Sequence, residues 1–311
     1  MQLLLEPISA AGNASRRGAR TPYGAETVAA GPTNEIPNAA DSGNGIDRRG
    51  LIVKGLAAAG AATLMSHAGT VQAAERLRPR RVFTGAVRNV VLVHGAYADG
   101  SSWTEVIERL HAAGVTATAV QNPLRSVADD AAATRLILAR HAKPTILVGH
   151  SYGGTVITEA GANPRVVGLV YVAARAPDAG EDYAALTKTF PAPPATAGIV
   201  YEDGFGSLTQ HAFLHDFANG VDRDRARVLY AVQGHVSATL FADKTTIAAW
   251  RSKPSWYAVS KRDRTTSPEL ERFLAKRMKA TTIELDSGHL SLITHARQIT
   301  ELILRAARHS G

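Results

Sequence analysis

The stretch from Thr145 to Gly154 constrains the fold of this chain more than any other. Its first part, Thr145–Val148, is a short apolar run that fits a buried strand. Gly149-His-Ser-Tyr-Gly153 follows and matches G-x-S-x-G, and residues 155–162 then predict a helix. Side chains flanking the serine would collide with the neighbouring strand and helix, which explains the two glycines. The pattern predicts that Ser151 is a nucleophile lifted clear of the sheet edge; the alternative is a glycine-rich turn with an incidental serine.

The rest of the chain, from about residue 82 to 309, alternates apolar runs with helical segments. This alternation predicts an α/β fold, in which a mostly parallel sheet of about six strands carries helices on both faces. The expected strands are 90–93, 116–120, 145–148, 166–173, 255–260 and 281–285. The expected helices are one that opens at Ser102, with capping-box spacing to Glu105, and those at 126–141, 155–162, 268–279 and 291–308.

Residues 178 to about 250 interrupt this alternation. Pro191-Ala-Pro-Pro194 and Gly204-Phe-Gly206 are typical of loops, whereas 222–231 and 245–251 predict helices. An insertion between two core strands at this edge of the sheet predicts a lid that shapes a substrate pocket. The alternative is a structural excursion with no role in binding.

The first 74 residues differ in composition from the rest. Residues 1–46 predict a disordered extension, unless translation starts downstream of them. Residues 47–74 resemble an export signal: a twin arginine at Arg48-Arg49, an apolar run too short to span a bilayer comfortably, and a cleavage site before Ala74. We therefore expect Tat export to the periplasm or cell exterior, without a stable membrane anchor. An alanine-rich helix of the fold is the alternative, and the protein would then be cytoplasmic.

The composition excludes several classes of site. The chain of 311 residues contains no cysteine, which excludes disulfides, thiolate metal sites and a cysteine nucleophile. The net charge is +8, but the basic residues are scattered and no nucleic-acid motif accompanies them. We expect neither a nucleic-acid partner nor a metal or other cofactor, and the sequence does not indicate an oligomeric state.

A serine hydroxyl is a weak nucleophile until a histidine takes its proton, and an acid must orient that histidine. In a strand-turn-helix arrangement of this kind the chain order is serine, acid, histidine. His289 is the best candidate base, because it follows the strand 281–285 in the polar loop Asp286-Ser-Gly-His289. The less well placed histidines are His94, His150, His211, His215 and His235.

Three aspartates compete for the role of the acid. Asp263 is favoured because it follows the strand 255–260 and precedes the helix at Pro268. Asp178 follows the strand 166–173, and Asp286 lies three residues before His289. Two backbone N–H groups must also face the oxyanion of an acyl-transfer intermediate. Tyr152 is expected to supply one, and Ala96, after His94-Gly95, the other.

Several motifs together resemble the α/β-hydrolase superfamily, and within it the small bacterial branch related to plant esterases and hydroxynitrile lyases. They are His94-Gly-Ala-Tyr-Ala-Asp-Gly-Ser-Ser-Trp103, Gly149-His-Ser-Tyr-Gly-Gly154, Tyr171-Val-Ala-Ala-Arg-Ala-Pro-Asp-Ala-Gly180 and Pro254-Ser-Trp-Tyr257 with Asp263-Arg264. The resemblance covers about residues 85–308. It implies a cofactor-free Ser151–Asp263–His289 triad on an eight-stranded fold or its six-stranded version. The chain departs from the pattern at Thr265-Thr-Ser267, where relatives usually carry an apolar residue and prolines.

The favoured hypothesis is a serine hydrolase that cleaves a small carboxylic ester through an acyl-enzyme on Ser151. A second hypothesis is a lyase of the hydroxynitrile-lyase type on the same triad, for which Lys188 and Lys244 are the candidate positive side chains. A third is a non-catalytic ligand-binding module, although binding alone would not require all three triad groups.

Overall fold

The structure is a computed structural model and describes residues 85–310. The expected disordered extension (1–46) and export signal (47–74) lie outside the described residues. No helix within residues 85–310 combines the length and the apolar composition needed to cross a bilayer.

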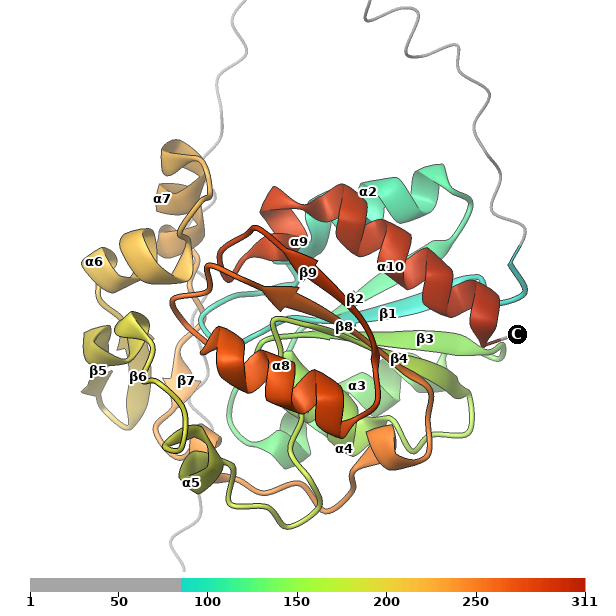
Figure 1. The fold of residues 1–311 in the computed structure, drawn as a ribbon, viewed down its shortest axis with the longest axis horizontal. Helices are drawn as coiled ribbons and strands as arrows, with labels where there is room; N and C mark the ends of the chain where they lie inside the picture. The colour runs from blue at the N-terminus through green and yellow to red at the C-terminus, as the bar shows by residue number, and fades with distance from the viewer. Residues whose placement is uncertain (1–84, 311) are drawn as a thin grey trace, which may run out of the picture. The chain divides into compact units, whose positions relative to one another are not determined.

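A six-stranded sheet forms the centre of the fold, and every neighbouring pair in it is parallel (Figure 1). The order across the sheet is β2-β1-β3-β4-β8-β9. The strands are β1 (Asn89–Val93), β2 (Thr116–Val120), β3 (Thr145–His150), β4 (Val166–Val172), β8 (Ser255–Ser260) and β9 (Thr281–Leu285). The expectation of about six core strands in a mostly parallel sheet is therefore confirmed.

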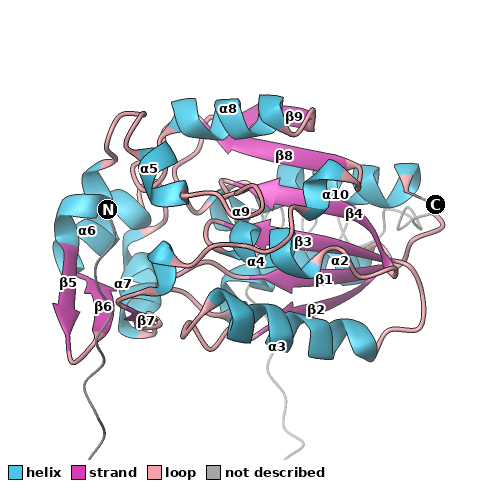
Figure 2. Cartoon of the chain, turned by 90° about the horizontal axis from the view of Figure 1, so that it is seen from below, coloured by secondary structure: helices cyan, strands magenta, loops and turns pink. Residues whose placement is uncertain are grey.

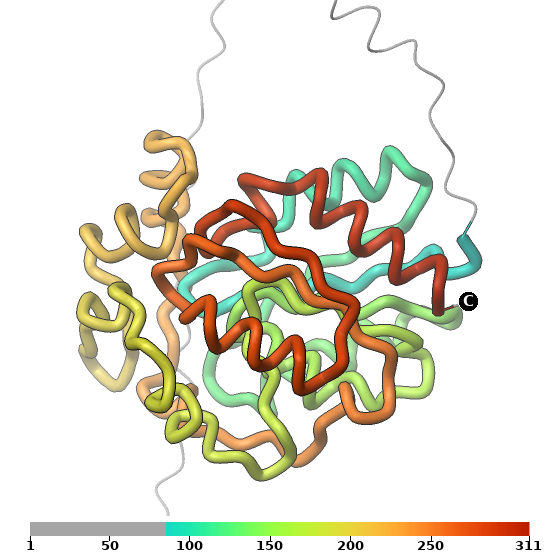
Figure 3. Tube along the Cα trace, viewed as in Figure 1, coloured from blue at the N-terminus to red at the C-terminus, as the bar shows by residue number. Residues whose placement is uncertain are grey.

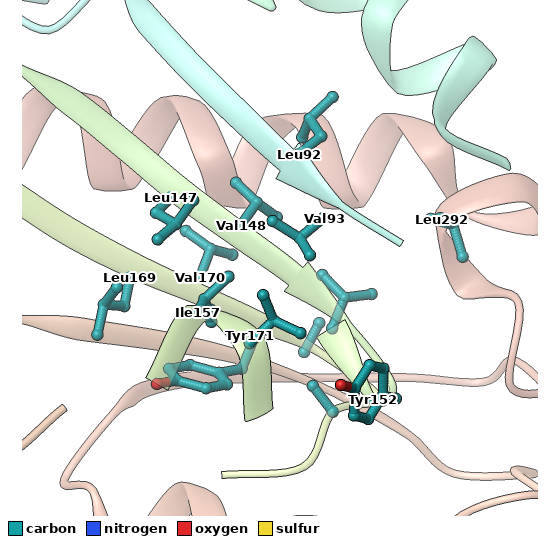
Figure 4. Packing of buried hydrophobic residues seen from close by; sticks show 14 of the residues in the cluster. Leu92, Val93, Leu147, Val148, Tyr152, Ile157, Leu169, Val170, Tyr171 and Leu292 are labelled. Carbon is teal, nitrogen blue, oxygen red and sulfur yellow. The ribbon is translucent and has the colours of Figure 1, made fainter. Parts of the chain in front are cut away.

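The middle strands are apolar on both faces because helices cover both sides of the sheet. Every residue of β3 is buried. Leu147 and Val148 of β3 lie among the side chains of β1 and β4 in the core (Figure 4). This packing fixes the position of the carboxyl end of β3, from which Ser151 follows directly.

Helices pack on the two faces of the sheet (Figures 1 and 2). Those on one face are α2 (Thr104–Ala112), α9 (Ser291–Thr294) and α10 (Ala296–His309). Those on the other face are α3 (Val127–Ala139), α4 (Gly153–Ala160) and α8 (Pro268–Arg277). Each of α3 and α8 begins after a serine whose hydroxyl accepts a backbone N–H, Ser126 and Ser267 respectively.

Two predicted helix boundaries are wrong. The segment expected to open at Ser102 begins with a 3-10 turn, η1 (Gly100–Trp103), and the cap is Asp99, whose carboxylate accepts the Ser101 N–H at 2.7 Å. The Ser102 hydroxyl donates instead to the Asp99 carbonyl. The last helix is divided into α9 and α10 at His295. Next to this break, the Thr294 hydroxyl donates a hydrogen bond to the Leu290 carbonyl and lies within hydrogen-bond distance of the His295 ring. Such local side-chain hydrogen bonds compete with the regular backbone hydrogen bonds of a helix.

The insertion (residues 178–250) lies between β4 and β8, at the end of the sheet to which the strands point (Figures 2 and 3). It contains a three-stranded antiparallel sheet, β5-β6-β7, that the sequence did not predict. Its helices include α7 (Arg223–Ala231), as expected from the sequence. The other elements are α5 (Tyr183–Thr187), η2 (Pro194–Gly198), β5 (Ile199–Glu202), β6 (Phe205–Leu208), α6 (Gln210–Ala212), η3 (Phe213–Phe217), β7 (Val236–Ser237), η4 (Leu240–Ala242) and η5 (Ala249–Arg251).

The helix expected over 245–251 is wrong: only the 3-10 turn η5 forms there. The cause is Glu159, a buried residue of α4. Its carboxylate accepts the backbone N–H groups of Thr246 (2.7 Å) and Ile247 (3.2 Å) and the Thr246 hydroxyl (2.8 Å). These charge-assisted bonds hold the segment extended against α4 and compete with helical hydrogen bonding.

Replacing Glu159 by alanine should therefore destabilise the protein by about 2 kcal/mol, because two partly buried N–H groups lose their acceptor. Urea unfolding measured by circular dichroism checks the value. The control is Glu301→Ala, which removes an exposed carboxylate that pairs with Arg297 and should cost less than about 1 kcal/mol. Equal losses in the two variants would contradict the role assigned to Glu159.

Candidate active site

Ser151 occupies a sharp turn between β3 and α4. Its backbone has φ of 53°, in the left-handed region that non-glycine residues rarely adopt. A Cβ at Gly149 would lie 2.6 Å from the Gly153 carbonyl oxygen, and a Cβ at Gly153 would lie 2.5 Å from the Val93 carbonyl oxygen. Both distances are shorter than any normal contact, so both positions of the G-x-S-x-G pattern require glycine.

Backbone hydrogen bonds hold Ser151 in this conformation. Its N–H donates to the Val172 carbonyl at 3.1 Å, at the end of β4. Its carbonyl accepts the N–H groups of Gly154 and Arg175, both at 3.0 Å. The turn is therefore tied to the carboxyl end of the neighbouring strand and to the segment that follows it.

Asp263 and His289 meet on the loops that follow β8 and β9. The His289 Nδ1 lies 2.6 Å from the Asp263 Oδ2, and both side chains are fully buried. The other carboxylate oxygen of Asp263 accepts the N–H groups of Thr265 (2.7 Å) and Thr266 (2.8 Å). The backbone at these two threonines, where the chain departs from the family pattern, thus donates hydrogen bonds that orient the carboxylate.

The opposite ring nitrogen of His289 is available for a proton. A carboxylate only accepts hydrogen bonds, so Nδ1 carries the proton and Nε2 presents a lone pair. Nε2 is buried and has no hydrogen-bond partner within residues 85–310. The ring packs beside His150 and Phe217, at centroid distances of 4.7 and 5.2 Å. The His289 ring thus packs against Phe217, which lines the same pocket as Ser151.

The rival acids bond to arginines elsewhere. Asp178 binds Arg251, and the exposed Asp286 lies 3.2 Å from Arg262. The structure therefore places Asp263, among the three predicted aspartates, against the His289 ring.

The two histidines nearest the turn are structural. His94 accepts the Asn122 N–H on Nε2 at 2.9 Å, and its Nδ1 lies 2.8 Å from the Gly95 carbonyl. His150 Nε2 lies 3.1 Å from the His289 carbonyl, to which it donates. Burial lowers the pKa of both histidines, and most strongly that of His150. His150 is thus a neutral support for the His289 backbone.

Ala96 and Tyr152 line the same pocket as Ser151. No loop or turn hydrogen bond within residues 85–310 uses the backbone N–H of either residue. The Tyr152 hydroxyl donates to the Asp130 carboxylate at 2.7 Å, and Asp130 also accepts the Leu124 N–H. Asp130 is buried and fixes the side chain of Tyr152, the residue after Ser151.

The pocket has a volume of about 510 Å³ and lies between the sheet edge and the insertion. Its walls are mainly apolar and aromatic. The core contributes Ala96, Tyr97, Ser151, Tyr152, Arg175, Thr265, Thr266, Ser267 and Leu270. The insertion contributes Tyr183, Ala184, Thr187, Lys188, Phe190, Pro191, Ala192, Pro193, Ala195, Thr196, Ile199, Leu208, Phe217 and Phe241. Of the two lysines singled out in the sequence, the exposed Lys188 lines the pocket and Lys244 does not.

The insertion also contacts the loops that carry the acid and the histidine. Asn219 accepts the His289 N–H at 3.3 Å and donates to the Arg262 carbonyl at 2.8 Å. Asp216 accepts a hydrogen bond from Arg264 at 2.7 Å. Sequence reasoning did not identify Asn219, because a single polar residue in an irregular segment gives no signal of its distant partners.

Glu271 of α8 is fully buried and accepts the Ser260 N–H at 3.0 Å. Burial and the nearby negative charge of Asp263 raise its pKa well above the usual value of 4.5. The folded protein therefore holds the Glu271 proton more tightly than the unfolded chain does. Within residues 85–310, no group of three or more His, Asp or Glu side chains is arranged as a metal site.

Two comparisons with known proteins, by family model and by sequence, both find alpha/beta hydrolases. A family model described as the alpha/beta hydrolase family matches residues 90–302. The alpha/beta hydrolase nvfD of Aspergillus novofumigatus is 24% identical over 241 residues, which are 70% of this chain and 96% of that protein.

Solved structures share the fold. A pyrethroid hydrolase from Sphingobium faniae superposes with a TM-score of 0.61 and 20% identity, over 71% of this chain and 98% of that chain. The methylesterase MES16 from Arabidopsis gives a TM-score of 0.59 and 19% identity, over 71% and 98%. At these identities the superpositions establish the fold alone.

The raised pKa of Glu271 predicts a pH dependence of stability. The folded state holds this proton more tightly than the unfolded state, so stability falls as pH rises above about 4.5 towards the folded-state pKa. The variant Glu271→Gln has no carboxyl group to ionise, so its stability does not fall in this way. The difference between its urea midpoint and that of the wild type should therefore shift in favour of the variant as pH rises. The control Glu284→Gln, which removes an exposed carboxylate whose pKa Arg272 lowers, should show a smaller change of opposite sign. A Glu271→Gln difference independent of pH would contradict the assignment.

Proposed function

The chain belongs to the alpha/beta hydrolase family, and on that premise we propose that it is a serine hydrolase that cleaves a small carboxylic ester. The observation that carries the proposal is the hydrogen bond between Asp263 and His289, whose other ring nitrogen has no hydrogen-bond partner within residues 85–310 and whose ring packs against Phe217, a residue that lines the same pocket as Ser151. A hydrolase, a methylesterase and a pyrethroid hydrolase among the similar proteins support it.

In the proposed reaction, His289 Nε2 takes the proton of the Ser151 hydroxyl as the serine oxygen attacks the ester carbonyl. The N–H groups of Ala96 and Tyr152 hold the resulting oxyanion. His289 then gives its proton to the leaving alcohol, and an acyl-enzyme remains on Ser151. Water attacks this acyl group with His289 again as the base, which releases the acid and restores the hydroxyl.

The electrostatic role of Asp263 follows from its bonding. Its carboxylate fixes the Nδ1–H tautomer, so Nε2 is the basic nitrogen, and it stabilises the imidazolium that forms. His289 Nε2 makes no hydrogen bond to Ser151 in the structure, which is common before substrate binds because catalytic hydrogen bonds tighten in the reacting complex.

The mainly apolar pocket suits an uncharged portion of the ester.

Ser151→Ala should lower ester turnover by at least about 10⁴-fold, because the acyl-enzyme requires the hydroxyl. The measurement is p-nitrophenyl ester hydrolysis over short to long acyl chains, with thermal melting as the control for folding. Residual turnover close to that of the wild type would rule out Ser151 as the nucleophile. A folded wild type that hydrolyses no chain length would favour the lyase hypothesis, and cyanohydrins would be tested next.

Asp263→Asn should reduce kcat by about 10³-fold or more, because the amide favours the wrong histidine tautomer. The matched control is Asp178→Asn. In the wild type, the Asp178 carboxylate binds Arg251 and makes no hydrogen bond to His289. We expect less than about a threefold change for this control. Steady-state kinetics on one p-nitrophenyl ester measures both variants, and a larger loss in Asp178→Asn would move the acid to the loop after β4.

A further inference from the structure

The charged side chains that line the pocket are all basic. They are Arg175 and Lys188, and no aspartate or glutamate among residues 85–310 lines it. The remaining lining is aromatic, aliphatic or hydroxylic. In surroundings of low dielectric, a positive charge that faces no carboxylate creates a strong preference for an anionic ligand.

Arg175 lies next to the proposed nucleophile. It follows β4 at the carboxyl edge of the sheet, and its backbone N–H donates to the Ser151 carbonyl at 3.0 Å. Its guanidinium lies over the Tyr183 ring, 4.3 Å from the centroid, and 5.2 Å from that of Phe241. Both rings line the pocket. These ring contacts, together with the Tyr183 hydroxyl beside the guanidinium, hold the cation in one place at the pocket wall.

Arg175 differs from the arginines around it. Arg251, Arg264 and Arg277 each bind a carboxylate, whereas no ion pair in the described part of the chain includes Arg175. Its Nε is buried and donates to no acceptor there. Burial lowers the pKa of this guanidinium, and the polar groups nearest to it are tyrosines. A half-buried positive charge that faces a pocket and pairs with no carboxylate favours a ligand that supplies an anion.

We propose that the substrate is an ester that carries a second, ionised carboxyl group, and that Arg175 binds this carboxylate while Ser151 attacks the ester carbonyl. The half-ester of a dicarboxylic acid is the simplest member of this class. Arg175 is then the residue that determines specificity for the anion, and the exposed Lys188 contributes only long-range attraction. This inference rests on the proposed ester chemistry at Ser151 but assigns a separate binding group.

Monomethyl adipate and dimethyl adipate provide matched probes, because they share one acyl chain and differ in the charge of its far end. Binding is measured by calorimetry on Ser151→Ala, which cannot turn the esters over, at about pH 7, where the half-ester is ionised. The half-ester should bind at least about tenfold more tightly than the diester. Equal affinity, or tighter binding of the diester, would overturn the proposal.

The same pair is then compared by kcat/KM in proteins with an intact Ser151. The half-ester to diester ratio should fall about tenfold or more in Arg175→Gln and recover in part in Arg175→Lys, which restores the charge but not the planar donor pair. Lys188→Gln should change the ratio by less than about threefold. Thermal melting establishes that each variant folds. An unchanged ratio in Arg175→Gln, or a larger change in Lys188→Gln, would overturn the assignment.

The two measurements separate this inference from the proposed reaction. If the half-ester binds tightly to Ser151→Ala, and binds more weakly when Arg175→Gln is added, the anion site stands even if the wild type hydrolyses neither ester. If the wild type hydrolyses the diester through Ser151 but shows no preference for the half-ester, the reaction stands and the anion site fails. 4-Acetoxybutanoate carries its carboxylate on the alcohol part of the ester and tests the other orientation. If Arg175→Gln lowers kcat/KM for this ester but not for monomethyl adipate, the substrate carboxylate does not lie on the acyl part.

Discussion

The left-handed backbone at Ser151 is the constraint on which the rest of the site depends. A non-glycine residue in this conformation costs about 1–3 kcal/mol. The surrounding structure offsets that cost through three backbone hydrogen bonds, to Val172, Gly154 and Arg175. Gly149 and Gly153 permit the close approach that those bonds require. The parallel sheet thus provides a rigid frame for a turn that would not persist in a short peptide.

The same edge of the sheet brings the other groups together. Asp263 and His289 follow β8 and β9, and Arg175 follows β4, so their positions derive from strands paired in fixed register. The insertion completes the site from outside: its aromatic residues wall the pocket, and Asn219 holds the loop of His289. A substitution in the insertion is therefore expected to affect both the shape of the pocket and the placement of the base.

The sequence predicted the parts of the fold that short-range patterns determine. Apolar runs identified the inner strands of the central sheet, the alternation of strands with helices identified the edge strands β2 and β9, and the glycine pattern identified the Ser151 turn. The helix predicted for residues 245–251 was wrong because Glu159, 87 residues away from Thr246 in the sequence, holds the backbone of this segment extended. The sheet of the insertion was missed because β5 and β6 have only four residues each, which is too short for a pattern that distinguishes a strand from a loop. Arg175 stood within a quoted motif, but its meaning depends on the pocket around it.

If Ser151 is the nucleophile of an acyl transfer, a fluorophosphonate will modify it, because this reagent forms a stable adduct only with an activated serine. Mass spectrometry of the folded protein after this treatment tests the role of Ser151 directly. We expect one adduct per chain, on the peptide that contains Ser151, and none in Ser151→Ala. An adduct on a different residue, or an unlabelled but folded wild type, would show that Ser151 is not the nucleophile.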